Sequence, residues 1–139
     1  MKATTNTPSK AKKDYWIFAE RELDDYPDHT ARSGKWLIFV PKADVDEVWK
    51  KIMQAVEKGK LGGTAKVSTA KPNPNSIDTS KHVICVYTYD ADDIVDVRRV
   101  RQALRELEIL GKISYKTDDS TFKGKYRKAG DTKISLYYE

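Results

Sequence analysis

The chain has 139 residues, of which 39% are hydrophobic, and a formal net charge of +5; this suits one folded domain rather than a disordered chain. No signal-peptide pattern opens it, and no apolar run reaches the roughly 20 residues that a membrane-spanning helix needs. Its single cysteine, Cys85, cannot form an intramolecular disulfide, so we expect a cytoplasmic protein without a membrane partner.

The first 13 residues are polar, small and basic, with four lysines and no acidic residue. Such a composition predicts a disordered basic tail. Residues 14–139 hold 22 basic and 21 acidic residues and are expected to form a single domain. Within this domain the basic residues gather in segments 60–81 and 112–133. That distribution fits a local anion site better than a general polyanion-binding surface.

The apolar pattern predicts strands and helices in the order ββαββαββ. Strands are expected at residues 15–19, 35–40, 64–69, 82–90, 112–116 and 132–138. The first helix begins at Asp44, which with Glu47 resembles a capping box, and it ends at Gly59. The second begins near Asp90–Asp93, where acidic side chains suit a helix N-terminus, and ends at Gly111.

The second helix has a regular apolar stripe, and Arg101 lies off it. The stripe consists of Ile94, Val97, Val100, Leu104 and Leu107. Together with the order of the elements, it predicts an α+β fold in which a mainly antiparallel sheet has both helices packed on one face.

Lys66 and Lys116 are the first candidates for a functional role. Strand side chains alternate, so Lys66 shares a face with Ser68 and Lys116 shares one with Ser114. The two lysines and two serines would then converge on one face of the sheet. An anion pocket would place both lysines and Arg127 close together, whereas an ordinary solvated sheet face is the alternative.

A second basic group lies in "TFKGKYRK", where cations surround Gly124. A glycine lets the backbone approach an anion, and an arginine offers a planar fork suited to phosphate. The predicted phosphate-binding residues are Ser68, Lys123, Lys125 and Arg127. A basic loop tip without a ligand is the alternative.

Other candidates have a structural alternative as well. His82 could transfer a proton near neutral pH, or it could be a structural residue at a strand edge. Trp16 and Trp36 could stack on a nucleobase, or they could pack in the core. No metal site is expected, since one cysteine and two distant histidines lack ligand spacing, and no cofactor-binding motif occurs.

Two stretches carry a resemblance to a known family. They are "KWLIFVPKADVDEVWKKIMQAVEKGKLGGTAKVST", which starts at Lys35, and "HVICVYTYDADDIVDVRRVRQALRELEILGKISYKTDDSTFKGKY", which ends at Tyr126. They resemble the phosphothreonine lyase domain proteins, a family that includes the basophilic-leukaemia-expressed proteins. The resemblance implies the fold of the cap-binding translation initiation factor, a curved antiparallel sheet backed by helices.

The resemblance implies two different activities. A phosphothreonine lyase eliminates phosphate with a lysine base and a general acid, which by residue type would be Lys66 or Lys116 and His82. Lys125 and Arg127 would then clamp the phosphate, and the base would need a lowered pKa. Cap recognition instead requires two exposed aromatic side chains around a base, an acid at its edge and cations at its phosphates.

We therefore expect a basic sheet face that binds a phosphorylated ligand, with phosphothreonine lyase activity as an extension. A non-catalytic protein that binds RNA or a cap-like nucleotide is the first alternative. A protein-interaction module, in which the lysines are merely solvated, is the second. The partner would be a phosphorylated peptide, a nucleotide or RNA, and the sequence leaves the oligomeric state open.

Overall fold

The computed structural model describes residues 7–71, 80–118 and 136–139, and their elements follow the predicted order ββαββαββ. The elements are β1 (Trp16–Glu20), β2 (Gly34–Pro41), α1 (Lys42–Glu57), β3 (Thr64–Ser68), β4 (Lys81–Thr88), α2 (Ile94–Glu106), β5 (Ser114–Thr117) and β6 (Tyr137–Tyr138). No helix among these residues is long and apolar enough to cross a membrane.

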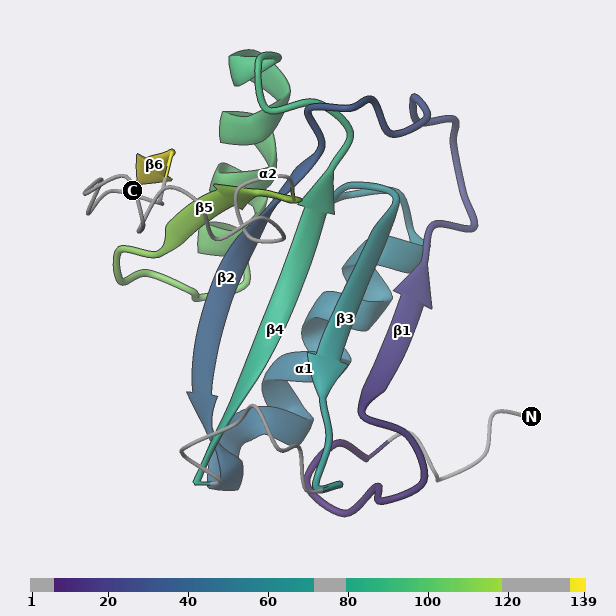
Figure 1. Cartoon of the computed structure of the whole chain (residues 1–139), viewed down its shortest axis with the longest axis vertical. Coiled ribbons are helices and arrows are strands. Elements are labelled where there is room, and N and C mark those ends of the chain that lie inside the picture. The colour runs from purple at the N-terminus through teal and green to yellow at the C-terminus, as the bar shows by residue number, and fades with distance from the viewer. Residues whose placement is uncertain (1–6, 72–79, 119–135) are drawn as a thin grey trace.

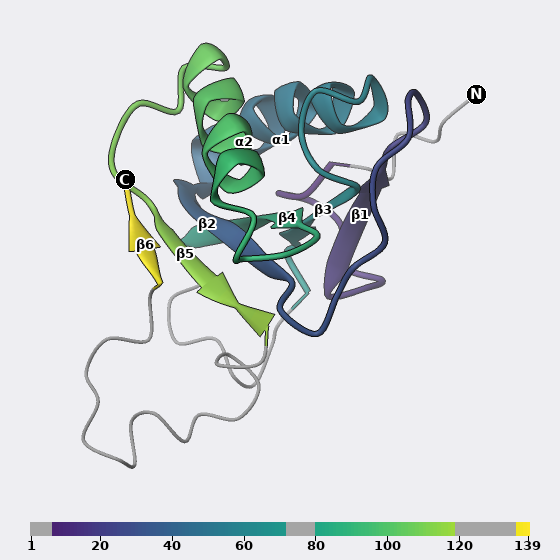
Figure 2. The same ribbon diagram turned by 90° about the horizontal axis from the view of Figure 1, so that it is seen from above.

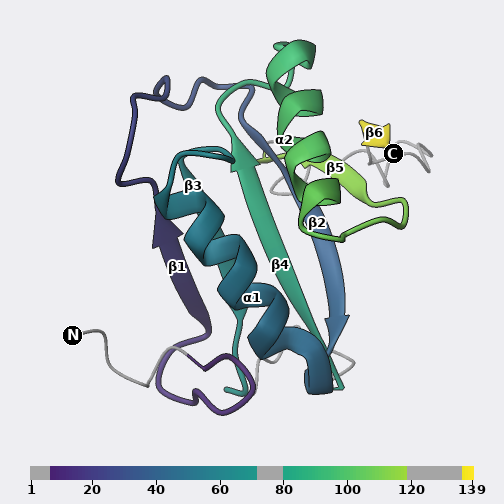
Figure 3. The ribbon, with the colours of Figure 1, turned by 180° about the vertical axis from the view of Figure 1, so that it is seen from behind.

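The strands form one curved sheet in the order β1-β3-β4-β2-β5-β6, and every neighbouring pair is antiparallel (Figure 1). Both helices lie on the same face of this sheet, as the views from above and from behind show (Figures 2 and 3). The prediction of an α+β fold with two helices on one face of a mainly antiparallel sheet is confirmed.

The core lies between the helices and the face of the sheet that they cover. The apolar stripe of α1 is buried there together with that of α2 and with alternate strand residues, because burial removes their apolar surface from water. The largest apolar side chains in this core are Trp36, Trp49, Tyr115, Ile52, Leu61, Ile84 and Leu104.

Helix boundaries differ from the predictions in two places. Helix α1 begins at Lys42, after Pro41 as N-cap, so the capping box predicted at Asp44 is wrong. Gly59 adopts a φ of 77° just after α1, as expected of a glycine that ends a helix. Beyond α2 the left-handed conformation is taken by Glu108, at φ 73°, rather than by Gly111.

Part of the predicted N-terminal tail is packed on the domain. Pro8 is buried, and both the backbone N–H and the hydroxyl of Ser9 donate to the carboxylate of Asp46 in α1, at 2.9 and 2.5 Å. The disordered tail predicted for residues 1–13 is therefore too long. Residues 1–6 lie outside the described residues, as do residues 132–135 of the strand predicted at 132–138.

Arg101 is a buried cation in α2, with only 1% of its surface exposed. Its guanidinium donates to three backbone carbonyls: Nε to Glu139 at 2.8 Å, Nη1 to Ile109 at 2.9 Å and Nη2 to Gly111 at 2.7 Å. A buried charge is costly unless it is fully hydrogen-bonded, and here three bonds compensate for it. Arg101 thus ties α2 to the turn before β5 and to the residue that follows β6.

We expect Arg101→Met to lower the free energy of unfolding by about 3 kcal/mol. Three carbonyls lose a charged donor, and such bonds contribute about 1.5–3 kcal/mol each without being additive. Urea denaturation measures the change. Arg98→Met is the matched control: Arg98 is exposed on the same helix, its one partner among the described residues is the Glu139 side chain at 3.3 Å, and its loss should cost less than about 1 kcal/mol. Equal losses would contradict this role of Arg101.

Candidate functional site

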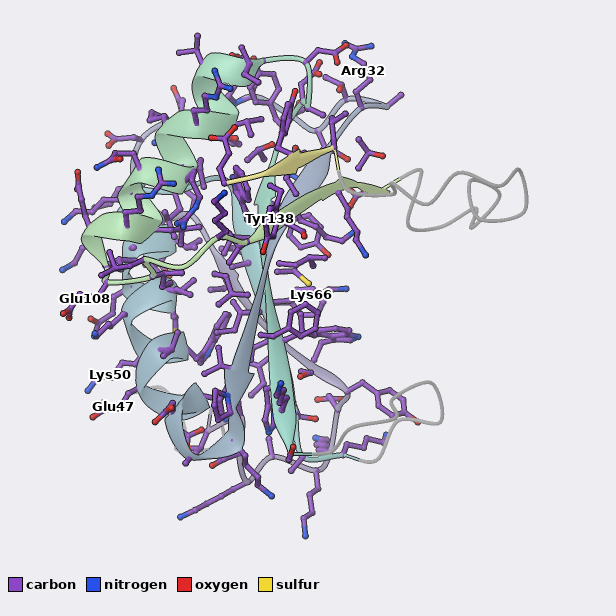
Figure 4. All side chains as sticks on the ribbon, turned by 90° about the vertical axis from the view of Figure 1, so that its left-hand side faces the viewer. Arg32, Glu47, Lys50, Lys66, Glu108 and Tyr138 are labelled. Carbon is purple, nitrogen blue, oxygen red and sulfur yellow. The ribbon has the colours of Figure 1, made fainter. Side chains whose placement is uncertain are left out.

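The face of the sheet opposite the helices carries polar and aromatic side chains, and we call it the open face. Register and alternation place on it Trp16, Phe18 and Glu20 of β1; Thr64, Lys66 and Ser68 of β3; Val83, Cys85 and Tyr87 of β4; Lys35, Leu37 and Phe39 of β2; Ser114 and Lys116 of β5; and Tyr138 of β6. Figure 4 shows Lys66 on this side of the sheet, whereas Lys50 and Glu47 lie on the helix side.

Lys66 lies among aromatic rings on the open face. Its Nζ is 4.0 Å from the centre of the Trp16 ring and 5.9 Å from that of Tyr87. Within the part of the chain that the structure describes, no carboxylate forms an ion pair with Lys66. The negative faces of the rings therefore hold the ammonium without neutralising its charge. Such a lysine can interact with an anionic group of a ligand.

A second pair of lysines, Lys35 of β2 and Lys116 of β5, lies on the open face, and Lys35 approaches the same Tyr87 ring as Lys66. Lys35 is the cross-strand partner of Lys116, and its Nζ contacts the Asp118 carboxylate at 2.8 Å, which also accepts from the Ser33 hydroxyl at 2.7 Å. The Tyr87 ring lies 5.8 Å from the Lys35 Nζ. Sequence reasoning missed Lys35, because the apolar run that follows it does not show which half of β2 faces the core.

The lysines do not form the single pocket that the sequence predicted. Lys66 and Lys116 share the open face with Ser68 and Ser114, as alternation predicted. However, β4 and β2 separate β3 from β5, and Ser114, not Lys116, lies level with Lys66, so the backbones of the two lysines are roughly 16 Å apart. Their predicted convergence is therefore wrong. The hydroxyl of Ser68 accepts from the Val83 N–H at 3.0 Å.

The second predicted basic group, in "TFKGKYRK", does not belong to the part of the chain that the structure describes. Lys123, Lys125 and Arg127 lie outside the described residues, and their predicted role in phosphate binding stays a prediction.

His82 lies on the face of β4 that the helices cover. It is 3% exposed, and its Nδ1 is 2.8 Å from the Ser68 carbonyl oxygen. The alternation that puts Lys66 on the open face puts His82 on the opposite side of the sheet. The prediction that His82 and a catalytic lysine act together on one ligand is therefore wrong for this geometry.

Trp36 is a core residue. It is fully buried, its Nε1 donates to the Val97 carbonyl at 3.0 Å, and its ring packs edge-on against Tyr115 at 5.2 Å between centres. Its predicted role in base stacking is wrong, because its position in β2 points it toward α2. Trp16, by contrast, lies half-buried on the open face and keeps the predicted role as a hypothesis.

Three further aromatic side chains of the open face are exposed to solvent. The exposed fractions are 60% for Phe18, 66% for Phe39 and 63% for Tyr138. Sequence reasoning did not single them out, because apolar and aromatic residues fill both alternating sets of β1 and β2. Exposed rings beside lysines form a surface on which planar groups can stack.

The open face offers no evident metal chemistry. Across residues 7–71, 80–118 and 136–139, no group of three or more His, Cys, Asp or Glu side chains is placed to hold a metal ion. Cys85 points to the open face but is only 3% exposed, since it lies between Lys66 and Leu37 in the sheet. Burial raises the pKa of its thiol.

Residues 7–123 match the family model of the basophilic leukemia-expressed protein Bles03. The chain belongs to the Bles03 family. This match begins at the N-terminal segment that packs on α1 and runs through β5, so it includes nearly the whole open face.

The fold of this Bles03-family chain is similar to that of solved translation initiation factors. Schistosome eIF4E complexed with m7GpppA and 4E-BP matches with a TM-score of 0.56 and 15% identity over 78% of this chain and 59% of that one. The same factor with m7GpppG and 4E-BP matches with 0.57 and 14% over the same shares. Ascaris suum eIF4E-3 with an m2,2,7G cap matches with 0.47 and 21% over 63% and 51%. The chain thus spans well under two thirds of each structure.

We expect Cys85 to react with Ellman's reagent at least about tenfold more slowly in the native protein than in denaturing urea at the same pH. Burial excludes the reagent, and the raised pKa leaves less of the nucleophilic thiolate near neutral pH. Absorbance of the released thiolate measures the rate. Equal native and denatured rates would show that Cys85 is accessible on the open face.

Proposed function

We propose that the open face binds a nucleotide unit of RNA without catalysing a reaction. Its base would stack on the aromatic side chains of β1, and its phosphate would contact Lys66. The position of the Lys66 Nζ, 4.0 Å from the Trp16 ring and uncompensated by a described carboxylate, carries this proposal. An aromatic ring and a cation side by side match a ligand that has a flat base and a negative phosphate.

An exposed ring beside Lys66 favours a nucleotide over a bare phosphate. Phe18 is the cross-strand neighbour of Lys66 and is 60% exposed, so an apolar ring and the ammonium are presented together. Stacking of a base on such a ring contributes about 1–3 kcal/mol and tolerates any base. A phosphate alone would gain the charge interaction but leave Phe18 in water.

Solved structures with a similar fold also support a nucleotide as the ligand. The two schistosome structures that share this fold contain m7GpppA and m7GpppG, which are nucleotide ligands. At 15% and 14% identity they support a nucleotide as the type of ligand for this fold. The positions of the residues that would bind it in this chain come from the open face itself.

Lyase chemistry has less support from the described residues. The proposed acid, His82, is buried on the covered face, whereas Lys66 lies on the open face. A β-elimination needs both the base and the acid within reach of one phosphothreonine. We therefore propose binding without catalysis.

Protein binding is the second candidate. The two schistosome complexes also contain 4E-BP. In this chain a cavity of about 570 Å³ lies on the helix side, between Ala55 of α1 and Arg99, Ala103 and Leu107 of α2 and the following turn. A protein partner at this cavity would leave the open face uncovered.

We expect guanosine triphosphate to quench tryptophan fluorescence saturably. Trp16 is the tryptophan on the open face, whereas Trp36 and Trp49 are 0% and 1% exposed, so a stacked base affects mainly Trp16. Lys66→Gln should weaken binding about tenfold, which corresponds to about 1.4 kcal/mol for a lost charged contact.

The matched control is Lys50→Gln, which removes the same charge from the exposed side of α1 and should leave the affinity unchanged. Trp16→Phe should abolish most of the quenching while calorimetry still detects the ligand. No calorimetric binding of guanosine triphosphate or of a short RNA by the unaltered protein would reject the proposal and favour protein binding.

A further inference from the structure

The segment of residues 7–14 lies beside β1, and the two line a common cavity. We propose that this segment and β1 together form a subsite that continues the open face past the edge of the sheet, so that the ligand is a single-stranded RNA of several nucleotides rather than a mononucleotide. The inference rests on the proposed function of the open face and specifies its ligand.

A cavity of about 610 Å³ lies between the N-terminal segment and β1. Its lining includes three lysines, Lys10, Lys12 and Lys13, and two aromatic side chains, Trp16 and Phe18. This volume lies within the range of about 300–1,000 Å³ that is typical of small-molecule sites. The cavity therefore has room for a nucleotide-sized unit.

The lysines of this cavity belong to a segment that is held in place rather than to a loose tail. Ser9 donates twice to Asp46 of α1, as described above. Farther along, the carbonyl of Ala11 accepts from the Ala70 N–H at 2.9 Å, and that of Lys13 accepts from the Lys71 Nζ at 3.1 Å. Anchored on both α1 and the end of β3, the segment presents its lysine side chains at a defined place along the β1 edge.

The charge of the segment favours an anionic ligand. Lys10, Lys12 and Lys13 are exposed, and none of them forms an ion pair with another described residue. Among the described residues that line the cavity with them, Asp14 is the one acid. Three uncompensated lysines around one cavity raise the local concentration of anions.

Trp16 connects this cavity with the open face. Its side chain lines the cavity, and its ring also lies 4.0 Å from the Lys66 Nζ. Trp16 is thus shared: Lys66, which does not line the cavity, contacts its ring, and the N-terminal lysines line the cavity together with it. Alternating cations and stacking rings along a path are the features by which proteins bind single-stranded nucleic acid, because consecutive phosphates and bases recur along the strand.

The test compares one nucleotide with a strand, using the full chain. The probes are guanosine triphosphate and an oligouridylate of about eight nucleotides, within the usual site sizes of about 4–16. The unaltered protein should bind the oligouridylate at least about tenfold more tightly, because it occupies both subsites. Fluorescence anisotropy of labelled oligouridylate and calorimetry with guanosine triphosphate measure the two affinities.

The double variant Lys12→Gln/Lys13→Gln should weaken oligouridylate binding about tenfold and leave guanosine triphosphate binding unchanged. The plot of log affinity against log salt should lose about 1.4 units of slope, since each phosphate contact on a single strand contributes about 0.7. Lys50→Gln/Lys58→Gln removes two exposed charges from α1 and its C-cap and should change neither affinity. Urea midpoints equal to that of the unaltered protein establish that both variants are folded.

The results distinguish a failure of the proposed subsite from a failure of the proposed nucleotide binding. Equal affinity for both probes, or an equal loss for both in Lys12→Gln/Lys13→Gln, would overturn the subsite while leaving nucleotide binding at Lys66 intact. Binding of neither probe would overturn the proposed function, and the subsite with it. Loss confined to the oligouridylate supports the subsite.

Discussion

The antiparallel register of β3, β4 and β2 is the constraint on which the rest of the structure depends. Because both helices cover one face of the sheet, each strand must give every second side chain to the core. The same alternation leaves the remaining side chains on the open face, so Ala65 and Val67 are buried while Lys66 between them is not. A slip of one residue in β3 would bury this lysine and expose both apolar neighbours.

Alternation also decides how much of the site the sequence could predict. In "TAKVS" polar and apolar residues alternate, so the face of Lys66 could be read directly. In "HVICVYT" and "KWLIFV" nearly every residue is apolar or aromatic, and such runs do not reveal which half faces the core. His82 and Trp36 lie in these two runs, so the sequence left a structural and a functional role open for each, and their burial supports the structural one.

Distances across the sheet depend on strand order, which local patterns do not contain. Lys66 and Lys116 were predicted correctly to share one face of the sheet but wrongly to share one pocket. Strands β4 and β2 lie between β3, which carries Lys66, and β5, which carries Lys116. The burial of Arg101 could not be predicted from local patterns either. It lies off the apolar stripe of α2, and the carbonyls that make its burial tolerable come from the turn before β5 and from Glu139.

The pairing of β1 with β3 also bears on how the chain acquires its structure during synthesis. β1 leaves the ribosome early, but its hydrogen-bonding partner follows only after β2 and the whole of α1. Such non-local pairing slows folding relative to local helix formation. The backbone N–H and C=O groups of β1 therefore stay unpaired until β3 emerges, which makes this apolar and aromatic segment prone to aggregation in the nascent chain.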